Sequence, residues 1–104
     1  MIAITIEGTI PDESCIQERT VELMNGSVEV ATIAVDVGEA KPIPIEAWGR
    51  RRIDFAKANV GRRALFVCQV VGHAAKYVNR DGDEADICSC RLKLKSTVPL
   101  YEGD

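Results

Sequence analysis

Residues 61–95 read GRRALFVCQVVGHAAKYVNRDGDEADICSCRLKLK, and they decide the fold because they predict two long strands joined by one tight turn. In the second strand, Cys88 to Lys95, apolar and polar residues alternate with the period of a half-buried strand. The first strand runs from Ala64 to Val78, and residues 79–83 supply an Asp-Gly turn. The expected inward positions are Cys88, Cys90, Leu92 and Leu94.

The outward face of this hairpin combines cations with an aromatic ring. The cations are Lys76, Arg80, Arg91, Lys93 and Lys95. We expect the turn to bring the ring of Tyr77 close to the basic row of the second strand. An exposed ring beside ordered cations suits a single-stranded nucleic acid, because bases stack on rings and phosphates need positive charge.

The rest of the chain predicts further strands and one helix. Alternation of apolar residues indicates strands at 1–10, 19–23, 28–37 and 43–48, and a helical pattern follows at about 50–59. Gly8 suggests a bend or bulge in the first strand. Asn25 and Gly26 supply the positive φ angles of a hairpin turn.

The resulting order is strand, hairpin, strand, helix, hairpin. Interpreted as five strands with one helix after the third, this order is the arrangement of an OB-fold, a five-stranded Greek-key barrel. The fold class is therefore all-β with one short helix. We expect residues 1–98 to form this single domain and residues 99–104 to form a short tail.

Composition restricts the class of protein further. The chain has 104 residues with 46% apolar content, enough for one core. No apolar run reaches the roughly 20 residues that span a bilayer, and the N-terminus lacks a basic head and a cleavage site. We expect a cytoplasmic protein without a membrane partner.

The net charge of −3 conceals an asymmetry along the chain. Residues 1–49 hold two cations and nine acids, whereas residues 50–95 hold eleven cations and five acids. A domain with one acidic and one basic region can bind a polyanion in spite of its net charge. The alternative is an ordinary mixed surface.

Four segments resemble one family when they are taken in order. They are 4–10 (ITIEGTI), 25–33 (NGSVEVATI), 45–49 (IEAWG) and 63–82. Together they resemble the bacterial single-stranded DNA-binding proteins over almost the whole chain. The resemblance implies an OB-fold, and it places a base-stacking aromatic on Tyr77 with a basic neighbour at Lys76.

The chain also departs from that family. The 38–44 loop has no aromatic residue, and His73 and Ala75 stand where the fourth strand is often basic. The sequence stops at Asp104 without the long linker and acidic tip that recruit replication enzymes. We expect weaker binding and fewer partners as a result.

Trp48 and the three arginines that follow Gly49 are further candidate binding residues. Trp48 either stacks a base or caps the core or a subunit contact. The residues Arg50, Arg51 and Arg52 lie in the first turn of the expected helix, where the macrodipole disfavours cations. An external anion would offset that cost, and so would Asp54 with solvent. The basic row itself is either a phosphate contact or a solvated face, and Phe55 and Phe66 are expected in the core.

Catalytic and metal sites are not expected. The four cysteines lack a C-x-x-C spacing, which favours buried thiols over a metal site. The sole histidine, His73, has no nucleophile motif around it, and the acids at 81–86 lack the ligand order of a calcium loop. We expect no enzyme activity and no cofactor.

The sequence thus favours binding of single-stranded DNA without sequence specificity, in replication, recombination or repair. Replication proteins are possible partners. The alternatives are an accessory protein of the primosome type with the same fold, and an OB-fold module that binds protein. The apolar first strand would be a free edge, which predicts a homodimer or homotetramer.

Overall fold

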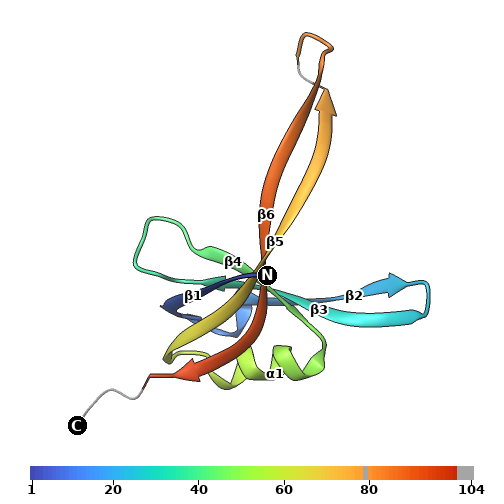
Figure 1. Ribbon diagram of the computed structural model, residues 1–104. Coiled ribbons are helices and arrows are strands. Elements are labelled where there is room, and N and C mark those ends of the chain that lie inside the picture. The colour runs from blue at the N-terminus through green and yellow to red at the C-terminus, as the bar shows by residue number, and fades with distance from the viewer. Residues whose placement is uncertain (79, 101–104) are drawn as a thin grey trace.

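The computed structural model describes residues 1–78 and 80–100, with residues 73–77 and 85–89 described by their backbone alone. Within these described residues, one α-helix, one 3-10 helix and six strands follow one another (Figure 1). They are β1 (Ile2–Thr9), η1 (Glu13–Cys15), β2 (Ile16–Leu23), β3 (Gly26–Val35), β4 (Ile43–Trp48), α1 (Arg50–Ala58), β5 (Arg63–Val78) and β6 (Glu84–Pro99). The prediction of a mostly β protein with one short α-helix is confirmed. None of the described helices has the length and apolar content to span a membrane.

The strands form one sheet in the order β1-β5-β6-β4-β3-β2, and this sheet is not closed. The predicted number of five strands is therefore wrong. Pro11 has no N–H for a ladder, and Asp12 accepts a hydrogen bond from the Ser14 backbone N–H at 2.8 Å, which starts η1. This break separates β1 from β2, and the two strands then pair with different neighbours, β5 and β3.

The core lies where the inward faces of β3, β4, β5 and β6 meet α1. Ile33, Ile45, Phe66 and Leu94 are among its fully buried side chains, and α1 contributes Ile53 and Ala56. Along β4, the inward Ile45 and Ala47 are buried, whereas the outward Glu46 and Trp48 are partly exposed. The period-2 pattern of the sequence thus predicts the inward face of this strand correctly.

The β2–β3 turn differs from its prediction in detail. Leu23 pairs with Gly26, so the turn consists of Met24 and Asn25. Gly26 has a φ of 132°, but no non-glycine residue in the described ranges has a positive φ. The hairpin is therefore confirmed, and the positive φ expected at Asn25 is wrong.

β5 and β6 are the longest of the described strands, with 16 residues each. The outer half of their hairpin rises away from the rest of the molecule (Figure 1). β1 pairs with β5 only as far as Val70, and Cys90 lies opposite Gly72, beyond that point. Cys90 is consequently exposed, so its predicted place in the core is wrong. Cys68 is buried as predicted, and burial raises the pKa of its thiol to about 11. The side chain of Cys88 lies outside the described part.

Gly8 is needed for space and not for a bulge. The pairing of β1 with β5 runs from Glu7 through Gly8 to Thr9 without a shift in register, so a bulge, one of the two expected features, is wrong. A Cβ atom at Gly8 would lie 2.6 Å from the carbonyl oxygen of Asp36 and 2.7 Å from Cγ1 of Val35. The end of β1 can approach the end of β3 only because this position has no side chain.

We expect Gly8→Ala to lower the free energy of unfolding by about 1 to 3 kcal/mol, because the added methyl must push the backbone of residue 36 away. Chemical denaturation followed by fluorescence of Trp48 measures this loss. Gly72→Ala is the matched control, since nothing lies within 4 Å of a Cβ atom there. Equal stability of the two variants would contradict the argument.

Candidate nucleic-acid interface

Trp48 and Lys93 form the centre of the candidate surface. They come from β4 and β6, which run parallel and pair at Glu46 and Lys93. The Lys93 ammonium nitrogen lies 4.4 Å from the centroid of the Trp48 ring, a cation–π contact. The predicted outward direction of Trp48 is thus confirmed, and the ring lies beside a cation of the basic row.

The basic row follows the outward positions of β6. Arg91, Lys93 and Lys95 alternate with Leu92, which is partly buried, and with Leu94, which is buried. No acidic side chain in the described ranges lies within ion-pair distance of any of these three cations. The row spans roughly 13 Å, from the rise of a strand. Its charges are therefore free to meet an external anion.

A groove between α1 and β6 extends this basic surface. It has a volume of about 390 Å³ and is lined by Arg51, Arg52, Phe55, Lys95 and Ser96. The Arg51 guanidinium lies 5.5 Å from the centroid of the Phe55 ring, and Arg52 donates a 3.4 Å hydrogen bond to the Trp48 carbonyl. The prediction that Phe55 belongs to the core is wrong, because its ring lines this open groove. Sequence periodicity missed it because Ile53 and Ala56 already fill the inward face of α1.

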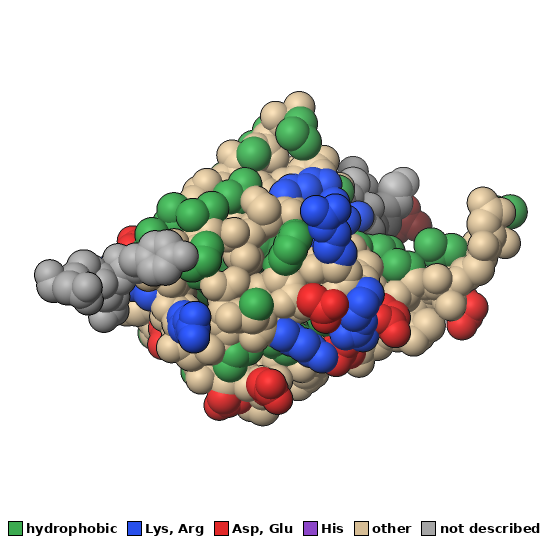
Figure 2. Space-filling view, turned by 90° about the horizontal axis from the view of Figure 1, so that it is seen from below, with side chains coloured by type: hydrophobic (Ala, Val, Ile, Leu, Met, Phe, Trp, Pro, Cys, Tyr) green, Lys and Arg blue, Asp and Glu red, His purple; other side chains and the backbone are tan. Residues whose placement is uncertain are grey.

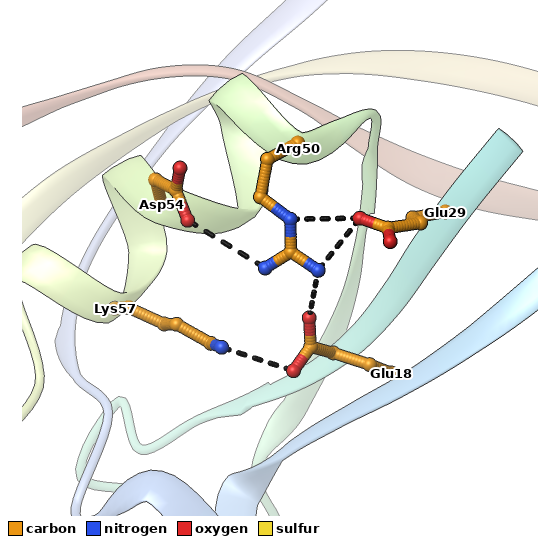
Figure 3. Close-up of polar contacts among 5 residues, drawn as sticks. All are labelled: Glu18, Glu29, Arg50, Asp54 and Lys57. Carbon is orange, nitrogen blue, oxygen red and sulfur yellow. Dashed lines mark hydrogen bonds and ion pairs between the residues drawn. The ribbon is translucent and has the colours of Figure 1, made fainter.

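Arg50 has a different environment from the two arginines that follow it (Figure 3). It contacts Glu18 and Glu29 at 2.6 Å and Asp54 at 3.6 Å, while Lys57 contacts Glu18 at 3.0 Å. Hydrogen bonds from Lys57 and then Arg50 lower the pKa of Glu18. These contacts tie α1 to β2 and β3, so the charge of Arg50 is already balanced within the fold.

Seen from below, the surface carries acidic and basic side chains close to one another (Figure 2). Arg50 and Lys57 are cations that contact acids directly. The cations of β6 and of the groove differ because none of them forms an ion pair with an acid of the described residues. The charge asymmetry of the sequence therefore becomes a local basic surface and not a uniformly basic half.

The remaining predicted residues lie on the outer half of the hairpin. Lys76 pairs with Asp86 and Tyr77 with Ala85, six positions along β6 from Arg91. Six positions correspond to roughly 20 Å along a strand. The expectation that the turn brings Tyr77 close to the basic row is therefore wrong in register. Arg80 is exposed in the turn, and the side chains of Lys76 and Tyr77 lie outside the described part.

Sequence reasoning did not single out Glu46, Arg19 or Thr32. Arg19 donates hydrogen bonds to Thr32 Oγ1 at 2.7 Å and to Glu46 Oε2 at 3.2 Å, across β2, β3 and β4. The sequence did contain one feature that could have indicated Glu46, because it lies on the outward face of its strand two residues before Trp48. These residues place one carboxylate within an otherwise basic face.

Comparisons with protein-family models and with curated proteins find no match to this chain.

We expect the Glu18 contacts to make stability depend on pH. The pKa of Glu18 in the folded state is lower than its ordinary 4.5. The contribution of Glu18 to the free energy of unfolding is therefore complete above pH 4.5, and it is lost as the pH falls through the folded-state pKa. The melting temperatures of the parent and of Glu18→Gln should therefore converge on acidification. Glu22→Gln, an exposed acid on the same strand, should show no such convergence. Parallel pH profiles for all three proteins would contradict a role for Glu18.

Proposed function

We propose that this protein binds single-stranded DNA by stacking bases on Trp48 and neutralising phosphates with the cations of β6 and the α1 groove. One observation carries the proposal: the Trp48 ring lies beside Lys93 on an outward face where the β6 cations Arg91, Lys93 and Lys95 have no acidic partner in the described ranges. Stacking is worth about 1 to 3 kcal/mol per base, which exceeds the value of a typical surface ion pair. The cellular process would be DNA replication, recombination or repair.

The proposed architecture is an OB-type barrel. If β1 and β2 are two halves of one strand, that strand has β5 and β3 as its neighbours, as in a five-stranded barrel. The end of β1 supports this view, because the Thr9 and Asp36 backbones exchange hydrogen bonds of 2.9 and 2.8 Å. The face of β3, β4 and β6 that carries Trp48 would then be the binding face.

The predicted binding residues have different roles in this proposal. The cations Arg51, Arg52, Arg91, Lys93 and Lys95 would contact phosphates. Arg50 would act through the fold, because three carboxylates already surround it. Lys76, Tyr77 and Arg80 would form a second contact region on the outer hairpin, about 20 Å from the row and therefore reached only by a longer strand.

The decisive experiment is a titration with oligo(dT), followed by quenching of Trp48, the only tryptophan. Affinity should fall with salt by a slope of about −0.7 per phosphate neutralised, and duplex of the same length should bind more weakly. Trp48→Ala, followed by anisotropy of a labelled strand, should weaken binding by about 1 to 3 kcal/mol and leave the salt slope unchanged.

Lys93→Ala should give the opposite pattern, a smaller loss of affinity with a shallower salt slope, because a phosphate contact is removed. Arg50→Ala should lower stability and leave the slope unchanged. Melting curves for each variant control for folding. Tight binding by a folded Trp48→Ala variant would refute stacking and favour a protein-binding module.

We also propose that two copies associate along β1. Ile2 and Ile4 lie on one side of this strand and are 66% and 37% exposed, and the free edge of β1 offers unpaired backbone groups. Light scattering at micromolar concentration should give a dimer or a tetramer. Ile2→Lys should shift the mass towards the monomer, whereas Met24→Lys, at a still more exposed residue in the β2–β3 turn, should not. A monomeric parent would remove this proposal.

A further inference from the structure

A carboxylate lies in the middle of the basic face. Glu46 is outward on β4, two residues before Trp48, and its side chain is only 16% exposed. One oxygen, Oε2, accepts a hydrogen bond from Arg19 at 3.2 Å. The other oxygen, Oε1, is buried and has no hydrogen-bond partner among the described residues. A buried carboxylate oxygen without a donor is costly, so this position calls for a donor from elsewhere.

Glu46 also lines a pocket beside the basic row. The pocket has a volume of about 320 Å³, and its apolar walls come from Ile43, Pro44 and Leu92. Thr32 and Arg91 supply a hydroxyl and a guanidinium. Apolar walls with a few convergent polar groups are the usual composition of a small-ligand site, and the volume lies at the lower end of that range.

The chemistry of the lining selects the kind of group that can enter. A phosphate is excluded from the carboxylate side by charge repulsion. A flat, largely apolar group that carries an N–H donor satisfies both the walls and Glu46. A nucleobase is the flat group that carries donors and acceptors on one edge.

We propose that this pocket takes one base of the bound strand and that Glu46 makes it prefer a base with an exocyclic amino group over thymine. The inference rests on the proposed function and adds a preference at one position to binding that otherwise tolerates any sequence. Arg91, exposed at the rim, would hold the phosphate of the same nucleotide.

The preference follows from the groups that each base presents to a carboxylate. Cytosine presents its N4 amino group, a donor that acidic side chains accept in known readout of bases. Thymine presents the O4 carbonyl at the same place, which a carboxylate repels. Its one remaining donor is N3–H, so the preference applies to a base whose exocyclic group faces Glu46. The terminal torsion of a Glu side chain is broad and roughly two-fold, so either oxygen can turn towards the pocket. Arg19 anchors the carboxylate through its 3.2 Å contact while it does so.

The test compares oligo(dC) with oligo(dT) of equal length, at one salt concentration and near neutral pH. The parent should bind oligo(dC) about three- to tenfold more tightly, which is the range that one net hydrogen bond supports. In Glu46→Ala this ratio should fall to about one, with oligo(dT) bound at least as tightly as by the parent, because a repulsive charge has gone. Glu22→Ala removes the same charge from an exposed site on β2 and should keep the ratio of the parent.

Each outcome decides one question. Equal binding of both strands by the parent, or a ratio that survives in a folded Glu46→Ala, overturns the role of Glu46 and leaves the proposed function standing. Loss of the ratio in Glu22→Ala as well would assign the effect to overall charge and overturn the pocket. Failure of the parent to bind either strand would overturn the proposed function itself.

Discussion

The parallel pairing of β4 with β6 at Glu46 and Lys93 is the contact on which the candidate interface depends. β4 ends at Trp48 and β6 carries the row of cations, so this one register decides which cation lies over the ring. The burial of Ile45 and Leu94 fixes the same register from the inside, because a one-residue shift of either strand would turn its own apolar side chain to solvent. Core packing and the composition of the outer face are therefore set by one constraint.

Charge pairing divides the cations into two groups with different tasks. Arg50 and Lys57 on α1 meet Glu18 and Glu29 on the β2–β3 hairpin, and these contacts use acids of the negatively charged first half. Arg51 and Arg52 point away from those acids and line the groove with Lys95. Neighbouring arginines in the sequence thus have separate roles, since successive helix positions differ by about 100° in direction.

The sequence allows the strands, the helix and the inward faces of β4 and α1 to be predicted, because alternation and helical period report burial directly. It fails where the environment depends on a distant element. Cys90 follows the inward register of β6 but lies beyond the part of the hairpin that β1 covers, so it is exposed. The partners of Arg50 and the pocket beside Glu46 depend on contacts between strands that are far apart in the sequence, and no local pattern contains them.

Lys93 over Trp48 raises the question of how a base can reach a ring that a cation already covers. A cation–π contact at an exposed site is worth about 0.5 to 1 kcal/mol, whereas base stacking is worth about 1 to 3 kcal/mol. A base therefore gains more from the ring than the ammonium loses. The displaced ammonium remains on a flexible side chain beside the incoming strand, where the phosphate offers it a full negative charge. In the free protein Lys93 covers apolar surface, and in the proposed complex the same side chain would neutralise a phosphate, so little of its interaction energy would be lost on binding.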